Sequence, residues 1–167
     1  RILRAIRDGE SIAVFGDFDT DGVTASVLLH EALGRLGGRT IVYIPHRVRE
    51  GHGLNLEAIE DLKRRGVSLL VTVDTGVTAV AEVVAAQAAG IDVIVTDHHV
   101  PGSGRPAACA VVTSGYGVGD YPFPHLTGAG LAFKLVQALD ARAGLPLDEG
   151  ALEMAALGTG ADMGPLQ

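Results

Sequence analysis

Carboxylates and imidazoles that could bind cations occur in three short segments, each directly after a run of apolar residues. The segments read Asp-Phe-Asp-Thr-Asp-Gly at 17–22, Asp-Thr-Gly at 74–76 and Asp-His-His at 97–99. Short apolar runs rich in β-branched residues are typical of buried strands in a parallel sheet, and the carboxyl ends of such strands carry the ligand-binding groups of open α/β folds. Because like charges at one place repel one another unless cations hold them, the pattern predicts a metal site.

The first segment also resembles the start of an EF-hand calcium loop, which needs a bidentate Glu at its twelfth position. Counting from Asp17, that position is Leu28, inside an apolar helical pattern, and a strand rather than a helix is expected before the segment. We therefore exclude the EF-hand. A donor set of oxygens with one or two imidazoles suits Mn²⁺ or Mg²⁺, whereas a thiolate zinc site would need cysteines.

The three acids of this first segment alternate along the sequence. Alternate residues of an extended chain point the same way, so Asp17, Asp19 and Asp21 could present their carboxylates to one place. The alternative is that each Asp forms a turn or caps a helix, since Asp favours both positions.

Strands and helices alternate in the pattern of apolar residues. Strands are expected over 11–15, 40–44, 68–73, 92–96 and 108–112, and helices over 22–36, 54–65, 78–89, 128–143 and 147–157. Such alternation is typical of βαβ units. The sequence predicts an α/β fold: a mostly parallel five-stranded, Rossmann-like sheet flanked by helices, with a helical segment at the C-terminal end.

Composition limits the kind of protein. The 167 residues suit one domain, and no apolar run reaches the length of a membrane span. Cys109 stands alone, as expected for a reducing cytosol. A formal net charge of −7 argues against a free-standing nucleic-acid-binding surface, unless several of the acids bind metal ions. An Arg as first residue suggests a fragment of a longer protein.

Six ordered motifs resemble the DHH phosphoesterase superfamily, and most closely its RecJ-type single-stranded-DNA exonucleases. They lie at 16–22, 47–55, 74–76, 97–99, 126–135 and 156–162. The resemblance covers nearly the whole chain and implies two Mn²⁺ or Mg²⁺ ions bridged by a carboxylate. Such a pair hydrolyses a phosphodiester by activating water and by neutralising charge in the transition state.

The resemblance also implies which residues form the site. As metal ligands it implies Asp17 and Asp19 for one ion, Asp21, His98 and Asp162 for the other, and Asp74 between the two. Around them it implies His99 facing a phosphate, Asp97 orienting the histidine pair, Arg47 and Glu50 lining the substrate path, and the amides of Gly128 and Gly130 meeting a phosphate. The catalytic residues would be Asp74, His98 and His99. Phe15 stands where many members carry a ligand His, so Asp17 must supply that contact.

A 5′-to-3′ exonuclease on single-stranded DNA is the function that the resemblance implies. The enzyme would act in DNA repair and recombination, in the cytoplasm and away from membranes. Residues 1–167 would be the DHH domain, with DHHA1 and OB-like domains downstream in the full-length protein that holds the DNA. Two alternatives stay open: a phosphodiesterase for short oligonucleotides or cyclic dinucleotides, and a non-catalytic scaffold or nucleic-acid-binding module with the same fold. The sequence does not identify protein partners.

Overall fold

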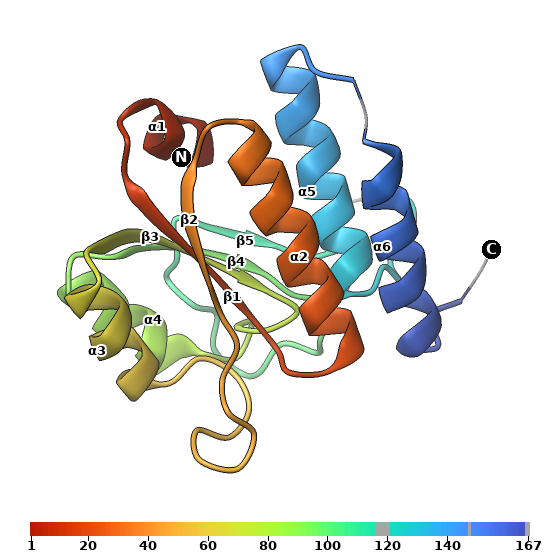
Figure 1. The fold of residues 1–167 in the computed structure, drawn as a ribbon. Helices are drawn as coiled ribbons and strands as arrows, with labels where there is room; N and C mark the ends of the chain where they lie inside the picture. Colours follow the sequence, from red (N-terminus) through yellow and green to blue (C-terminus); the bar gives the residue numbers. More distant parts are fainter. Residues whose placement is uncertain (116–120, 147, 166–167) are drawn as a thin grey trace.

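Five parallel strands form the centre of the fold in a computed structural model that describes residues 1–115, 121–146 and 148–165 (Figure 1). The strands are β1 (Ser11–Gly16), β2 (Arg39–Tyr43), β3 (Val67–Val73), β4 (Asp92–Thr96) and β5 (Ala110–Val112). The helices are α1 (Ile2–Arg7), α2 (Thr20–Arg35), α3 (Leu56–Arg64), α4 (Val80–Ala88), α5 (Gly128–Ala143) and α6 (Glu149–Ala161). The predicted α/β class, strand number and parallel direction are confirmed.

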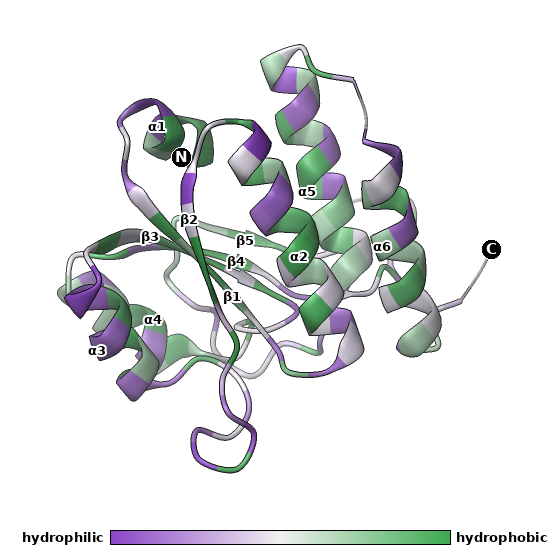
Figure 2. Cartoon of the chain, in the orientation of Figure 1, coloured by the Kyte–Doolittle hydropathy of each residue, from purple (hydrophilic) through white to green (hydrophobic). Residues whose placement is uncertain are grey.

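Helices cover both faces of the sheet. Figure 1 shows α2, α5 and α6 packed side by side on one face, and α3 and α4 on the other. Strand β1 serves both layers, because successive side chains point to opposite faces. Its Ile12 and Val14 join the core under α2 and α5, whereas Ala13 and Phe15 join the core over α3 and α4. Figure 2 accordingly shows apolar residues along the central strands.

The strand order β2-β1-β3-β4-β5 explains where a site can form. The chain leaves β1 for β2 on one side and then returns to place β3 on the other side. Loops that diverge in this way leave a crevice at the carboxyl ends of the two strands. The segments after β1, β3 and β4 therefore meet at one edge of the sheet.

Several boundaries differ from those predicted. Helix α1 was missed, because six residues with only Ile2 and Ala5 buried give no helical periodicity. Helix α2 begins at Thr20, two residues before the predicted start, because the side chain of Asp19 caps it by accepting from the amide of Gly22 at 2.9 Å. The last helix runs past its predicted end to Ala161, and its predicted start at Leu147 lies outside the described residues.

None of the described helices has the length and apolar character that crossing a bilayer requires.

Candidate metal-binding active site

Strand register brings the three predicted segments together. Gly16 pairs with Val73, and Val73 pairs with Thr96. The residue directly after each of these strands is an aspartate, so Asp17, Asp74 and Asp97 follow three residues aligned across the sheet. The expectation that acidic groups gather at one edge of the sheet follows directly from this register.

Asp74 lies at the centre of the site. Its backbone has a φ of 60°, an uncommon conformation for a residue other than glycine, and its side chain is buried. A carboxylate oxygen of Asp74 lies 3.0 Å from Nε2 of His98. Burial raises the pKa of Asp74 to about 7, although the contact with His98 acts in the opposite direction. A Cβ at Gly128 would fall 2.4 Å from the Asp74 side chain, so glycine is needed there.

Asp21 of α2 forms hydrogen bonds with the start of α5. Its two carboxylate oxygens accept hydrogen bonds from the amides of Gly128, at 2.6 Å, and Ala129, at 2.9 Å. These amides belong to the first turn of α5, where the positive end of the helix dipole favours an anion. The same carboxylate lies 3.7 Å from Nε2 of His98. Asp21 is thus oriented toward the site by the helix that closes it.

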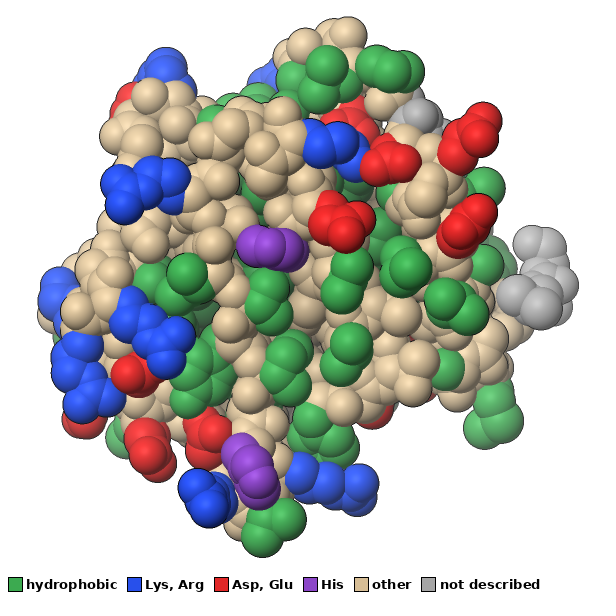
Figure 3. Space-filling view, in the orientation of Figure 1, with side chains coloured by type: hydrophobic (Ala, Val, Ile, Leu, Met, Phe, Trp, Pro, Cys, Tyr) green, Lys and Arg blue, Asp and Glu red, His purple; other side chains and the backbone are tan. Residues whose placement is uncertain are grey.

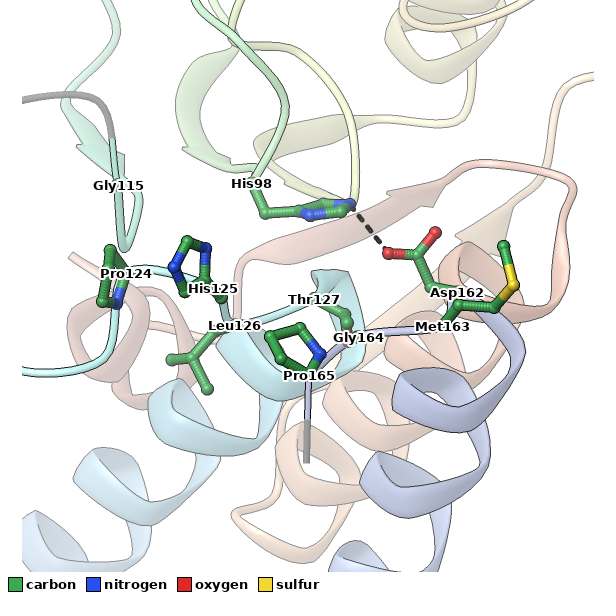
Figure 4. Close-up of a pocket in the computed structure, with 10 residues that line it drawn as sticks. All are labelled: His98, Gly115, Pro124, His125, Leu126, Thr127, Asp162, Met163, Gly164 and Pro165. Atoms are coloured by element: carbon green, nitrogen blue, oxygen red, sulfur yellow. Dashed lines mark ion pairs between the residues drawn. The ribbon is translucent and has the colours of Figure 1, made fainter. Parts of the chain in front are cut away.

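Asp162 comes to the site from the far end of the chain. It ends α6, and its carboxylate lies 3.9 Å from Nε2 of His98. Figure 4 shows the two side chains facing each other at the edge of a pocket of about 300 Å³. Burial raises the pKa of Asp162 above its ordinary value. In His98 the contact with Asp74 outweighs burial, so the pKa of the imidazole is raised.

Asp97 holds His99 in place. One carboxylate oxygen contacts Nδ1 of His99 at 2.7 Å and accepts from its amide at 3.0 Å, and the other accepts from the amide of Val77 at 2.8 Å. Burial alone would raise the pKa of Asp97, but these hydrogen bonds outweigh it and the pKa is lowered. The hydrogen bond with Asp97 raises the pKa of His99 to about 9. The imidazole of His99 is therefore protonated at neutral pH.

Two sets of side chains have ligand atoms close enough to share a metal ion. One consists of Asp74, His98 and His99, and the other of Asp21, His98 and Asp162. Oδ1 of Asp74 is buried and lies 3.0 Å from Nε2 of His98, but among the described residues it accepts no hydrogen bond of normal geometry. A buried carboxylate oxygen without a donor is costly, and a cation relieves that cost. The oxygen-rich donor set therefore fits a hard divalent ion such as Mn²⁺ or Mg²⁺.

Asp17 and Asp19 belong to neither set. Asp17 accepts from the amide of Phe18 at 2.7 Å and lines a second pocket of about 300 Å³ beside Asp74 and His99. Asp19 caps α2 and is exposed. The three acids do not follow one extended stretch, because the helix begins at Thr20. The capping alternative therefore applies to Asp19.

The glycines at the start of α5 have acceptors within the protein. The amide of Gly128 donates to Asp21, and the amide of Gly130 donates to the hydroxyl of Thr127 at 3.3 Å. Neither amide is free to meet a phosphate in this structure, contrary to the expectation from sequence. The physical reason is that Asp21 and Thr127 already cap the helix.

Arg47 and Glu50 lie in the loop after β2, which lines the second pocket through His52 and Gly53. Arg47 is exposed, with its guanidinium 4.9 Å from the ring centre of Phe18. Glu50 instead binds its own loop through Tyr43 and the amide of His46. Sequence reasoning missed Phe18 because an aromatic residue between two acids has no metal-binding chemistry. Its contacts with Arg47 and with His52, at 4.7 Å between ring centres, become visible only in the fold.

Comparison with known proteins gives consistent matches. Residues 11–159 match the model of the DHH family, N-terminal domain. The chain is 44% identical over 166 residues to the single-stranded-DNA-specific exonuclease RecJ of Bacillus subtilis strain 168, covering 99% of this chain and 21% of that protein. It is 39% identical over 177 residues to the protein of the same name from Escherichia coli strain K12, covering 99% of this chain and 31% of that protein.

A solved structure agrees with these matches. The crystal structure of exonuclease RecJ bound to manganese has a TM-score of 0.87 and 39% identity, covering 99% of this chain and 42% of that one. The chain spans between 21% and 31% of the length of these two curated relatives.

Proposed function

Since this chain belongs to the DHH family, we propose that it is the metal-dependent phosphodiesterase domain of a longer RecJ-type enzyme. That enzyme removes nucleotides from the 5′ end of single-stranded DNA, in DNA repair and recombination in the cytoplasm. The observation that carries this proposal is the gathering of three carboxylates around one imidazole: Asp74, Asp21 and Asp162 lie 3.0, 3.7 and 3.9 Å from Nε2 of His98. Carboxylates held this close together suit bound divalent ions.

We assign the metal ligands as follows. Asp74 would be shared by two Mn²⁺ or Mg²⁺ ions, Asp21, His98 and Asp162 would hold one of them, and Asp17 and Asp19 would hold the other. Support comes from the solved relative described as bound to manganese and from the buried Oδ1 of Asp74, which accepts no hydrogen bond of normal geometry among the described residues. When bound, such ions activate water and neutralise charge on a phosphodiester.

His99 acts on the substrate in this proposal. Its side chain is 56% exposed, and its raised pKa keeps it charged at neutral pH. A charged imidazole at the mouth of the site can donate a hydrogen bond to a phosphate oxygen. Asp97 keeps the ring in that orientation through the 2.7 Å contact with Nδ1. The Arg47 side chain supplies a second positive charge, held over the ring of Phe18 in the first acidic segment.

The longer protein holds the DNA. Figure 3 shows basic side chains around the loop after β2, basic and acidic side chains mixed over α3, and acidic side chains near α6. With a net charge of −7, this chain has little capacity to bind a DNA backbone by itself. We propose that downstream DHHA1 and OB-like domains provide the remaining phosphate contacts.

Two assays with the longer protein test the substrate. Single-stranded DNA labelled at its 3′ end and a cyclic dinucleotide are incubated side by side with Mn²⁺, with Asp74→Ala as the inactive control. We expect progressive loss of nucleotides from the 5′ end of the DNA and no activity in the control. Preferential cleavage of the cyclic dinucleotide would replace the exonuclease with the smaller phosphodiesterase, and inactivity on both would favour the scaffold.

A further inference from the structure

Glu50 is held by its own loop rather than left free for a substrate. Oε1 of Glu50 accepts a hydrogen bond from the hydroxyl of Tyr43 at 2.5 Å. Oε2 accepts from the backbone amide of His46 at 2.7 Å. These hydrogen bonds lower the pKa of Glu50 below its ordinary value, so the side chain is ionised at neutral pH. Both oxygens are therefore used to close the turn that contains Arg47.

The core of the protein fixes the other end of this connection. The ring of Tyr43 stacks on Phe15, with ring centres 5.4 Å apart and planes 10° from parallel. Phe15 is fully buried near the end of β1, two residues before Asp17. Burial of the phenol, followed by its hydrogen bond to Glu50, raises the pKa of Tyr43 to about 12, so its hydroxyl remains a donor. The loop is thus tied to a rigid strand.

The same loop contacts the first acidic segment through the ring of Phe18. The guanidinium of Arg47 lies 4.9 Å from the ring centre of Phe18, which stands between Asp17 and Asp19 in sequence. The ring of His52 contacts Phe18 from the same loop. Glu50 binds the backbone amide of His46, at the start of the turn. This contact fixes the backbone directly before Arg47, and so the position from which the Arg47 side chain extends.

We infer that Glu50 is a positioning residue, which acts through Arg47 by closing residues 46–50 between Tyr43 and Phe18. This inference rests on the proposed function, in which Arg47 contacts the DNA. An exposed arginine has many rotamers and loses conformational entropy when it binds a phosphate. A contact that already fixes the backbone of the arginine reduces this loss. Without Glu50, the Arg47 side chain would still be present but no longer held beside the metal ligands.

Proteolysis measures the closed turn without any nuclease assay. Trypsin cleaves after arginine, and the turn contains Arg47 and Arg49. In Glu50→Gln and Tyr43→Phe, we expect cleavage in this turn at least ~3-fold faster than in the unaltered protein, since each change removes a hydrogen bond that holds it. Glu60→Gln, an exposed change on α3, is the control. An unchanged cleavage rate in both variants would show that Glu50 does not hold the turn.

Steady-state kinetics of the longer protein on single-stranded DNA test the link to Arg47. Glu50→Gln, Tyr43→Phe and Arg47→Ala should each raise KM by about 5- to 10-fold, the range expected for the loss of about one ordinary hydrogen bond, with kcat changed by less than about 3-fold. In the Arg47→Ala background, Glu50→Gln should have no further effect on KM, because its action passes through the missing guanidinium.

The outcomes separate the two proposals. Independent, additive effects of Glu50→Gln and Arg47→Ala on KM would contradict a role through Arg47. A fall in kcat together with the melting temperature would indicate that Glu50 only supports the fold. If the unaltered protein does not cleave DNA, the proposed function fails, whereas the trypsin rates still decide whether Glu50 closes the turn.

Discussion

Nε2 of His98 lies 3.0 Å from a carboxylate oxygen of Asp74, where the carboxyl ends of β3 and β4 meet. The histidine also reaches Asp21 and Asp162, so one imidazole connects residues from four separate segments. Asp74 is buried in the gap left by Gly128. The arrangement concentrates carboxylates around one imidazole, and it is most easily understood as a site prepared for divalent cations.

Removal of the Asp74 carboxylate should abolish metal binding at the centre of the site. Isothermal calorimetry of the unaltered chain with Mn²⁺ is expected to show about two binding sites, as in other paired-metal phosphoesterase sites. Asp74→Ala should show none with comparable affinity, because the oxygen shared by both ions is missing. Asp8→Asn, an exposed change far from the site, serves as the control. Binding that survives in Asp74→Ala would contradict the bridging role.

Without metal, the protein should become less stable as the pH rises from about 6 to about 9, since the native pKa values of Asp74 and His99 are raised to about 7 and about 9. Folding raises the pKa of Asp74 from 3.8 to about 7, so the stability it gives at low pH is lost from about pH 4 to about pH 7, and the last part of that loss falls in this range. Folding raises the pKa of His99 from 6.5 to about 9, so the stability it gives below pH 6.5 is lost toward pH 9.

Thermal unfolding across this pH range provides the measurement. Asp74→Asn should flatten the lower part of the curve, and His99→Asn the upper part. Excess Mn²⁺ should stabilise the protein more at high pH than at low pH, because binding displaces protons from the ligands. A metal-free melting temperature that rises steadily from about pH 6 to about pH 9 would contradict these assignments.

Asp97→Asn should reduce activity by way of His99. An amide in place of the carboxylate removes the charge that raises the pKa of His99, so the imidazole becomes neutral near pH 7. We expect a ~10- to 100-fold loss of kcat/KM, as for other residues that orient a catalytic or ligating histidine. An NMR titration of the His99 ring should show the lowered pKa. An unchanged pKa would show that Asp97 does not control this histidine.

Replacement of two glycines of α6 by alanine should change the free energy of unfolding in opposite directions. A Cβ at Gly158 would lie 2.4 Å from the Cβ of Ala129 and 2.7 Å from a carboxylate oxygen of Asp21, whereas a Cβ at Gly160 meets nothing within 4 Å. Gly158→Ala should therefore cost about 1–3 kcal/mol of unfolding free energy and weaken Mn²⁺ binding. Gly160→Ala should add up to about 1 kcal/mol through helix propensity. Urea unfolding of both variants measures the difference.

Much of the fold could be predicted from local patterns. The period of apolar residues identified the five strands and the helices that follow them, because each helix buries one stripe and each inner strand is buried on both faces. Asn55, a residue type that favours helix N-caps, caps α3 by accepting from the amide of Ala58 at 2.8 Å. The strand order could not be obtained in this way, because it depends on packing between segments that are distant in sequence.

The site could be predicted only in part, because it too depends on contacts between segments that are distant in sequence. Three acidic segments at strand ends were visible in the sequence, but the use of Asp21 oxygens by the amides of α5 depends on how two helices meet. The hydrogen bond of Glu50 with Tyr43, at the end of β2, was likewise not visible in the sequence. Contacts between side chains from different elements are set by the tertiary structure alone.

Anomalous diffraction from crystals grown with Mn²⁺ tests the central claim most directly. The account predicts two manganese peaks, both in contact with the Asp74 carboxylate, and one of them also touching Asp21, His98 and Asp162. A single peak, or two peaks of which neither touches Asp74, would contradict it.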